Sequence, residues 1–129
     1  MSKPRPVVAI VDDDPRLLES LENLLESAGY VAHSFSSAGS LLIRGLAGVD
    51  VLITDIGMPG VDGFELRDLV KRARPQLPVF LITGRHEIAD QSRAQGISGF
   101  FRKPFDALAL LAAVGDALRN QETEDGHES

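Results

Sequence analysis

The sequence has 129 residues, 43% of them hydrophobic, which suits one compact domain with its own core and excludes a disordered chain. It contains no cysteine, so disulfides, thiol catalysis and cysteine–zinc sites are excluded. The net charge of −6 argues against a nucleic-acid-binding surface, and no apolar run is long enough for a membrane span or a signal peptide. We therefore expect a cytoplasmic protein that binds neither membrane nor nucleic acid directly.

Short apolar runs alternate with amphipathic stretches along the chain. Strands are predicted at 7–11, 30–32, 51–53, 79–82 and 100–101. Helices are predicted from Pro15 to a stop at Gly29, after Ser36 or Ser37, between Asp62 and Pro75, over the weakly apolar segment 86–95, and after Asp106. Asp14, Asp62 and Asp106 stand where N-caps are expected, because their carboxylates can accept hydrogen bonds from the first turn of a helix.

Five β–α units in strict alternation indicate an α/β fold with a parallel sheet and helices on both faces. Right-handed crossovers favour a doubly wound, flavodoxin-like sheet of five strands in the order 2-1-3-4-5. We predict one domain over residues 1–119. The remaining segment, 120–129, is acidic and lacks large apolar residues, so we predict a disordered tail or the start of a linker.

Polar residues follow the predicted strands that would be neighbours in this sheet. Asp12 and Asp13 follow the first strand, Asp55 the third, Thr83 the fourth and Lys103 the fifth. Two carboxylates about 4 Å apart repel each other by about 4 kcal/mol at an effective dielectric constant of about 20. Protonation, a lysine or a hard cation such as Mg²⁺ would lower that cost. An aspartate in such a site can act as a nucleophile and form an aspartyl phosphate.

Four segments carry a family resemblance. They are Val-Asp-Asp-Asp at 11–14, Asp-Ile-Gly-Met-Pro-Gly-Val-Asp-Gly-Phe-Glu at 55–65, Leu-Ile-Thr-Gly at 81–84, and Phe-Phe-Arg-Lys-Pro-Phe at 100–105. With these segments in order at strand ends, the chain resembles the receiver domain of two-component response regulators from about Val7 to Leu118. Such a domain accepts a phosphoryl group and acts as a switch rather than as an enzyme, although it takes part in its own phosphotransfer and dephosphorylation.

The resemblance implies a role for each residue of the cluster. Asp55 would be the phospho-acceptor. Asp13 would bind Mg²⁺ directly, Asp12 would bind it mainly through water, and the main-chain carbonyl of Gly57 would be a further ligand. Mn²⁺ would be a substitute for Mg²⁺.

Three further residues would read the phosphoryl group. Thr83 would donate a hydrogen bond to it, Lys103 would pair with it, and Phe100 would be the aromatic switch that turns inward when Thr83 moves. The resemblance also implies a cis Lys103–Pro104 bond. The output face would consist of segment 86–95, the fifth strand and the last helix.

The partners implied are a sensor histidine kinase or a histidine phosphotransfer protein, together with a downstream output domain or protein. A homodimer formed on phosphorylation is a further expectation. The family also implies that the residues two positions after Asp55 and after Thr83 tune the lifetime of the phosphoryl group, and here these are Gly57 and Arg85.

Two other functions fit parts of the same pattern. A haloacid-dehalogenase-type phosphatase would use Asp12 as nucleophile with Asp14, but this chain is short for a cap and lacks an acidic pair after Lys103. A phosphorylation-independent interaction module would keep the fold without the chemistry. The basic run Lys71, Arg72 and Arg74 is interpreted as a solvated helix face.

Overall fold

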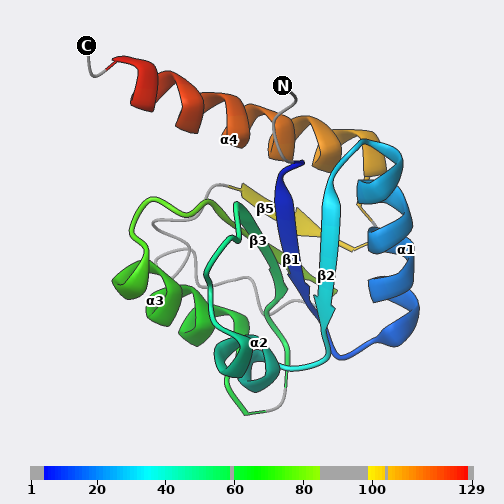
Figure 1. Cartoon of the computed structure of the whole chain (residues 1–129). Helices are drawn as coiled ribbons and strands as arrows, with labels where there is room; N and C mark the ends of the chain where they lie inside the picture. Colours follow the sequence, from blue (N-terminus) through cyan, green and yellow to red (C-terminus); the bar gives the residue numbers. More distant parts are fainter. Residues whose placement is uncertain (1–4, 59, 85–98, 104, 128–129) are drawn as a thin grey trace.

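A computed structural model describes residues 5–58, 60–84, 99–103 and 105–127, with side chains up to residue 120. The strands are β1 (Val7–Val11), β2 (Val31–Phe35), β3 (Val51–Asp55), β4 (Val79–Thr83) and β5 (Gly99–Arg102). The helices are α1 (Pro15–Ser27), α2 (Ala38–Arg44), α3 (Gly63–Ala73) and α4 (Ala107–His127). Figure 1 shows the strands side by side in one twisted sheet, with helices packed around it.

The sheet has the predicted topology. Its strand order is β2-β1-β3-β4-β5, and each neighbouring pair is parallel. All five residues of β3 and of β4 are buried, as expected for central strands covered on both faces. Their side chains are mainly β-branched or aromatic, which suits a buried pleated strand. The prediction of a doubly wound parallel sheet is therefore confirmed.

Two separate clusters of side chains cover the two faces of the sheet. On one face, α2 and α3 contribute Leu41, Leu66 and Val70 to a cluster with inward residues of the strands. On the other face, α1 and α4 contribute Leu21 and Leu110 to the second cluster. Because successive residues of a strand point to opposite faces, each strand supplies both clusters.

The predicted N-caps are present at the start of three helices. Asp14 accepts a hydrogen bond from the main-chain N–H of Arg16, with Pro15 at the first helical position. Asp62 and Glu65 form a reciprocal capping box at the start of α3. Asp106 accepts from the N–H of Leu108 at the start of α4. Each cap satisfies donors that a helix leaves unpaired in its first turn, and it also fixes where the chain leaves the preceding loop.

Four of the five strands extend beyond their predicted bounds, by one or two residues in β3 and β4 and most clearly in β2 and β5. β2 extends to Phe35 because it continues to pair with β1 up to the Val11–Phe35 match. β5 begins at Gly99, opposite Phe80 in the register. A Cβ atom at Gly99 would lie 2.7 Å from Phe80 Cδ1, so glycine is required there by packing. The predicted helix at 86–95 lies outside the described residues.

The last helix is longer than the apolar pattern predicts. α4 continues to His127, and Figure 1 shows its final turns projecting beyond the sheet. Its backbone is therefore helical through 121–127, which the composition assigns to a disordered tail. Glutamine and glutamate, which make up three of these seven residues, are good helix formers. The domain boundary near residue 119 stays a prediction.

The basic run at the end of α3 is not simply a solvated face, so that interpretation is wrong for two of its three members. Lys71 Nζ donates hydrogen bonds to the main-chain oxygens of Leu77, at 2.7 Å, and of Pro75, at 3.3 Å. Arg74 donates through one nitrogen to two main-chain oxygens of the loop before β3. Arg72 is exposed, as expected.

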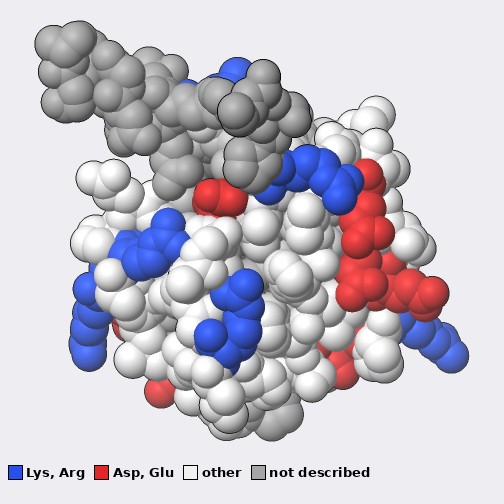
Figure 2. Space-filling model, in the orientation of Figure 1, with Lys and Arg blue, Asp and Glu red and all other residues white. Residues whose placement is uncertain are grey.

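The surface charge is unevenly distributed. Figure 2 shows acidic side chains gathered over α1, which carries Glu19, Glu22 and Glu26. On the same face, the basic side chains form separate groups rather than one continuous surface. Within the described ranges, no helix is long and apolar enough to cross a membrane.

Candidate functional site

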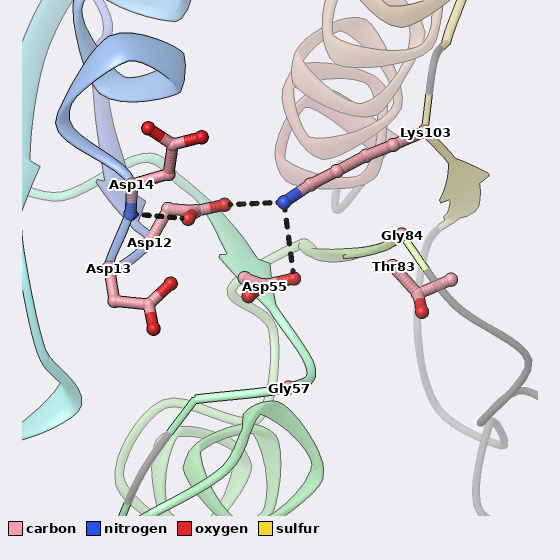
Figure 3. Close-up of a pocket in the computed structure, with 8 residues that line it drawn as sticks. All are labelled: Asp12, Asp13, Asp14, Asp55, Gly57, Thr83, Gly84 and Lys103. Atoms are coloured by element: carbon pink, nitrogen blue, oxygen red, sulfur yellow. Dashed lines mark hydrogen bonds and ion pairs between the residues drawn. The ribbon is translucent and has the colours of Figure 1, made fainter.

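Four neighbouring strand ends build one pocket. Asp12 follows β1, Asp55 ends β3, Thr83 ends β4 and Lys103 follows β5. The pocket is lined by Asp12, Asp13, Asp14, Asp55, Gly57, Thr83, Gly84 and Lys103 (Figure 3). In a parallel sheet the carboxyl ends of all strands lie at one edge, which is why residues up to 91 positions apart meet here.

Lys103 reaches between two buried carboxylates. Its Nζ lies 3.1 Å from Asp12 Oδ2 and 3.5 Å from Asp55 Oδ1. The other oxygen of Asp12, Oδ1, accepts a hydrogen bond from the N–H of Asp14 at 2.9 Å. Figure 3 shows the ammonium group lying between the two aspartates, with Thr83 near the carboxyl end of β4. Lys103 therefore offsets part of the charge repulsion in the pocket.

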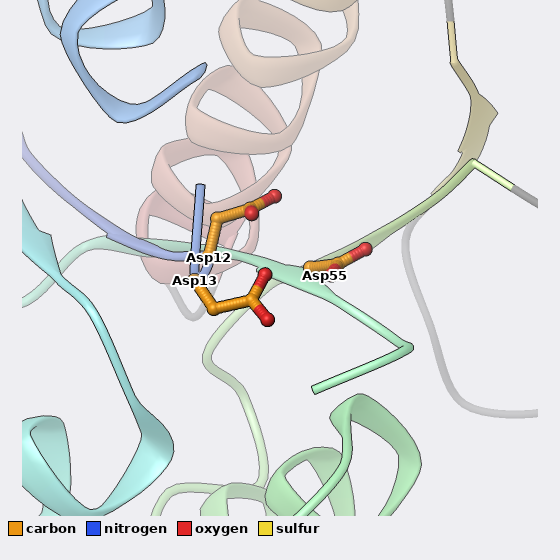
Figure 4. A group of neighbouring side chains, drawn as sticks. All are labelled: Asp12, Asp13 and Asp55. Atoms are coloured by element: carbon orange, nitrogen blue, oxygen red, sulfur yellow. The ribbon is translucent and has the colours of Figure 1, made fainter. Parts of the chain in front are cut away.

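Three carboxylates are close enough to bind one cation. Asp12, Asp13 and Asp55 each offer an oxygen atom, and these oxygens lie within 4.8 Å of one another (Figure 4). Asp13 is exposed, whereas Asp12 and Asp55 are only 1% and 6% exposed. Carboxylate oxygens at the mouth of a pocket suit a hard divalent cation that keeps several waters. The residues therefore fit the metal that the family resemblance implies.

The surroundings disfavour the charged forms of the two buried acids. Burial raises the pKa of Asp12, and the hydrogen bonds from Asp14 and Lys103 oppose this only in part. Burial also raises the pKa of Asp55, and the nearby charge of Asp12 raises it further. For Lys103, burial by itself lowers the pKa, but the hydrogen bond to Asp12 and the two carboxylates hold it above its usual value. The pocket therefore carries unfavourable negative charge that a cation would relieve.

Of the remaining predicted site residues, Thr83 and Gly57 line the pocket, whereas Phe100 does not. Thr83 is buried at the pocket, and its main-chain oxygen accepts a hydrogen bond from the N–H of Lys103 at 2.7 Å. Gly57 lies at the rim. Phe100 is half-buried in β5 and packs against the cluster under α2 and α3, away from the described lining of the pocket. Pro104, and with it the predicted cis bond, lies outside the described residues, as does Arg85.

Sequence reasoning missed two residues that hold the main chain of Asp55. Thr54 is fully buried, and its hydroxyl donates to the main-chain oxygen of Asp55 at 3.1 Å. Gly63 is buried against the same peptide. A glycine in the first turn of a helix was a signal in the sequence, because glycine is a poor helix former. The hydroxyl of Thr54 left no such signal, since threonine is common in buried strands.

Comparison with known proteins agrees with this geometry. The family model of the response regulator receiver domain matches residues 8–115. The chain is 38% identical over 112 residues to the transcriptional regulatory protein GlrR of Escherichia coli K12, covering 84% of this chain and 25% of that protein. It is 35% identical over 115 residues to the transcriptional regulatory protein FixJ of Azorhizobium caulinodans, covering 86% of this chain and 54% of that protein. The chain thus spans between a quarter and about half the length of these relatives.

Solved structures show the same likeness. A CheY-like response regulator receiver domain protein from Methanospirillum hungatei superposes with a TM-score of 0.87 at 27% identity, covering 94% of this chain and 99% of that one. The response regulator StyR superposes with a TM-score of 0.82 at 33% identity, covering 97% of this chain and 65% of that one. With the sheet order, the acidic pocket and the bridging lysine all in agreement, the chain belongs to the receiver domains of two-component response regulators.

Proposed function

We propose that this receiver domain accepts a phosphoryl group on Asp55 in a Mg²⁺-dependent reaction. The observation that carries the proposal is that the Asp55 carboxylate lies in one cluster with the acidic residues after β1 and also contacts Lys103 after β5. Asp12, Asp13 and the main-chain carbonyl of Gly57 would hold the metal, with Mn²⁺ as a substitute. When bound, the cation would neutralise charge on the acids and on the transferring group.

In this proposal an oxygen of Asp55 attacks the phosphorus atom of a phosphohistidine. A new P–O bond forms, the P–N bond breaks, and the imidazole leaves with the electron pair of that bond. Lys103 then pairs with the phosphoryl oxygens, which requires it to give up part of its contact with Asp12. The hydroxyl of Thr83 donates to another of these oxygens. Water attack on the acyl phosphate later returns Asp55 and releases inorganic phosphate.

The geometry favours Asp55 over Asp12 as nucleophile, and so argues against the dehalogenase-type phosphatase. Both oxygens of Asp12 are engaged, Oδ1 by the N–H of Asp14 and Oδ2 by Lys103 at the shorter of its two ion pairs. Asp14, the second acid that such a phosphatase would need, caps α1 through its own carboxylate. Among the residues that the structure describes, the Asp55 carboxylate has only the longer contact with Lys103, so it is the better placed to react.

The test is the intact mass of the protein after incubation with Mg²⁺ and acetyl phosphate. We expect one added phosphoryl group in the wild type, and none with a metal chelator or in Asp55→Asn. Asp62→Asn is the matched control, because it makes the same chemical change outside the pocket and asparagine caps a helix as well as aspartate does. If Asp55→Asn is still labelled and Asp12→Asn is not, the result would instead support the phosphatase.

An unlabelled wild type would not by itself separate rapid loss of the phosphoryl group from an interaction module without chemistry. Beryllofluoride distinguishes these two cases, because it mimics a bound phosphoryl group that cannot hydrolyse away. Saturable binding that requires Mg²⁺ would indicate rapid loss. Absence of binding would support the phosphorylation-independent module.

The proposal includes partners and an output. The donor would be a sensor histidine kinase or a histidine phosphotransfer protein in the cytoplasm, and the output an attached domain or a separate protein. The relatives GlrR and FixJ are transcriptional regulatory proteins, which supports an output in transcription. Homodimer formation on phosphorylation is part of the same proposal.

Thr83 would couple the phosphoryl group to Phe100 and the output face. We expect Thr83→Ala to accept the phosphoryl group at near the wild-type rate, while the amide NMR shifts of β5 and α4 change little on phosphorylation. Ser34→Ala, which removes a hydroxyl on the opposite edge strand, is the control and should respond as the wild type does. A full response of β5 in Thr83→Ala would rule out this route.

A further inference from the structure

The glycine at position 63 is not explained by the local conformation of the chain. Gly63 is the first residue of α3 and follows the N-cap Asp62. Its backbone does not have the positive φ seen at Gly29 and Gly60, so an alanine could adopt the same dihedral angles. Glycine is also a poorer helix former than alanine. The reason for a glycine here must therefore lie in what surrounds it.

The surroundings of Gly63 leave no room for a side chain. A Cβ atom there would lie 2.5 Å from the main-chain oxygen of Asp55 and 2.8 Å from Ile56 Cα. The second distance is about 0.7 Å shorter than the roughly 3.5 Å at which carbon atoms attract each other best. Both neighbours are backbone atoms, which cannot rotate aside as a side chain can. Any side chain at this position would push α3 away from the peptide that joins Asp55 to Ile56.

That peptide and the one after it are held on several sides. The hydroxyl of Thr54 donates to the oxygen of Asp55 at 3.1 Å. The N–H of Gly63 donates to the oxygen of Ile56 at 3.0 Å, and the N–H of Ile56 donates to the oxygen of Ile82 in β4 at 2.9 Å. These contacts fix the main chain at the point where it leaves β3. They therefore also fix the direction of the Asp55 side chain, which starts from that main chain.

We propose that Gly63 is a positioning residue for phosphoryl transfer. By admitting α3 against the peptide after Asp55, it holds the acceptor carboxylate and the carbonyl of Gly57 in the geometry that the reaction needs. The inference rests on the function proposed above and deepens it. A displacement of about 1 Å at a reacting group can slow a reaction by about 100-fold.

The test compares Gly63→Ala with Gly39→Ala. Both changes replace glycine by alanine in the first turn of a helix, but a Cβ at Gly39 would meet nothing closer than Ser37 Oγ at 3.8 Å. With saturating acetyl phosphate and Mg²⁺, we expect Gly39→Ala to be labelled at the wild-type rate. We expect labelling of Gly63→Ala to be about 10-fold to 100-fold slower. Circular dichroism at the assay temperature gives the folded fraction by which each rate is corrected.

A second readout needs neither metal nor donor. Amide hydrogen exchange in the metal-free protein reports the opening of the loop between β3 and α3. We expect faster exchange at Ile56 and at position 63 in Gly63→Ala, and no change there in Gly39→Ala. Thr54→Val is an independent variant, because it removes the hydroxyl that binds the oxygen of Asp55 while keeping the shape of the side chain. We expect it to be labelled several-fold more slowly than the wild type, and it serves as the test if Gly63→Ala does not fold.

The outcomes separate this inference from the proposed function. If the wild type is labelled and the corrected rates of Gly63→Ala and Gly39→Ala are equal, the positioning role is overturned and the proposed function stands. The same holds if Gly63→Ala does not fold and Thr54→Val is labelled at the wild-type rate. If the wild type neither takes up the phosphoryl group nor binds beryllofluoride, the proposed function fails and this inference fails with it.

Discussion

The two edges of the sheet use charged side chains in opposite ways. At the carboxyl edge, where the strands end, Asp12, Asp13 and Asp55 bring their oxygens within 4.8 Å of one another. Lys103 lies within 3.5 Å of two of them. These groups face each other across a pocket, and of their contacts described above only that of Asp12 Oδ1 with the N–H of Asp14 is to the main chain.

At the amino edge, where the strands begin, charged side chains bind main-chain groups instead. Asp50 accepts a hydrogen bond from the N–H of Val7 at the start of β1, at 2.8 Å. Arg74 donates to the oxygens of Leu46 and Val49 at 2.8 and 2.7 Å, just before β3. Lys71 donates to the loop that precedes β4. These charges complete the hydrogen bonding of the loops that the sheet needs.

The difference indicates what each edge contributes. Charges at the amino edge stabilise the fold, because they form hydrogen bonds with main-chain N–H and carbonyl groups of the loops that precede the strands. At the carboxyl edge the fold brings like charges together in a buried pocket. Their repulsion and desolvation lower the stability of the folded state until a cation or another ligand binds. Three measurements of stability should expose this contrast.

The largest effect is expected at the amino edge. Arg74→Met keeps the apolar stem of the side chain but removes the charged donor from two main-chain oxygens, of which that of Leu46 keeps the N–H of Val49, and should lower the free energy of unfolding by about 2–3 kcal/mol. Urea denaturation gives the value. Arg72→Met, at an exposed position in the last turn of α3, should change it by no more than about 0.5 kcal/mol. Equal losses in the two variants would show that the hydrogen bonds of Arg74 add nothing.

A smaller effect is expected when Mg²⁺ is added. A ligand that binds only the folded state at ten times its dissociation constant raises the free energy of unfolding by about 1.4 kcal/mol. Arg74→Met should show the same increase as the wild type, because the metal site is at the other edge. Asp13→Asn should lose most of it, since Asp13 is an exposed member of the cluster whose removal leaves the core intact. An undiminished increase in Asp13→Asn would contradict this site.

The smallest effect is the pH dependence without metal. The pKa of Asp55 is raised above its usual 3.8 by burial and by the charge of Asp12. A carboxyl group with a raised pKa in the folded state contributes stability below its usual pKa, and that contribution is lost as pH rises through the raised value. Asparagine does not titrate, so Asp55→Asn cannot lose this contribution as pH rises. The free energy of unfolding of the variant, measured from pH 4 to pH 7 in chelator, should therefore increasingly exceed that of the wild type as pH rises.

Asp62→Asn is the control for this titration, since Asp62 caps a helix outside the pocket. The free energy of unfolding of Asp62→Asn should not increasingly exceed that of the wild type as pH rises. A constant difference between Asp55→Asn and the wild type across the range would mean that the carboxylate at position 55 is not destabilised by its surroundings.

Much of the fold could be predicted from local patterns. Apolar runs of two to five residues located the strands, and Asp14, Asp62 and Asp106 located the helix starts, because caps act on the N–H groups of the next few residues. β2 was predicted too short because its last residues are held by pairing with β1 rather than by their own apolar character. Gly99 was not expected inside β5 because only the ring of Phe80 requires a glycine there.

The sequence by itself also determined which residues meet at the site. Strict alternation of strands and helices implies a parallel sheet, and such a sheet gathers Asp12, Asp55, Thr83 and Lys103 at one edge whatever the details of packing. Only the tertiary structure decided that Lys103 lies nearer to Asp12 than to Asp55, that Arg74 binds a loop 25 and 28 residues earlier, and that α3 leaves no space beside Gly63. The physical reason is range, because periodicity and caps act over a few residues, whereas these contacts depend on how whole elements pack against one another.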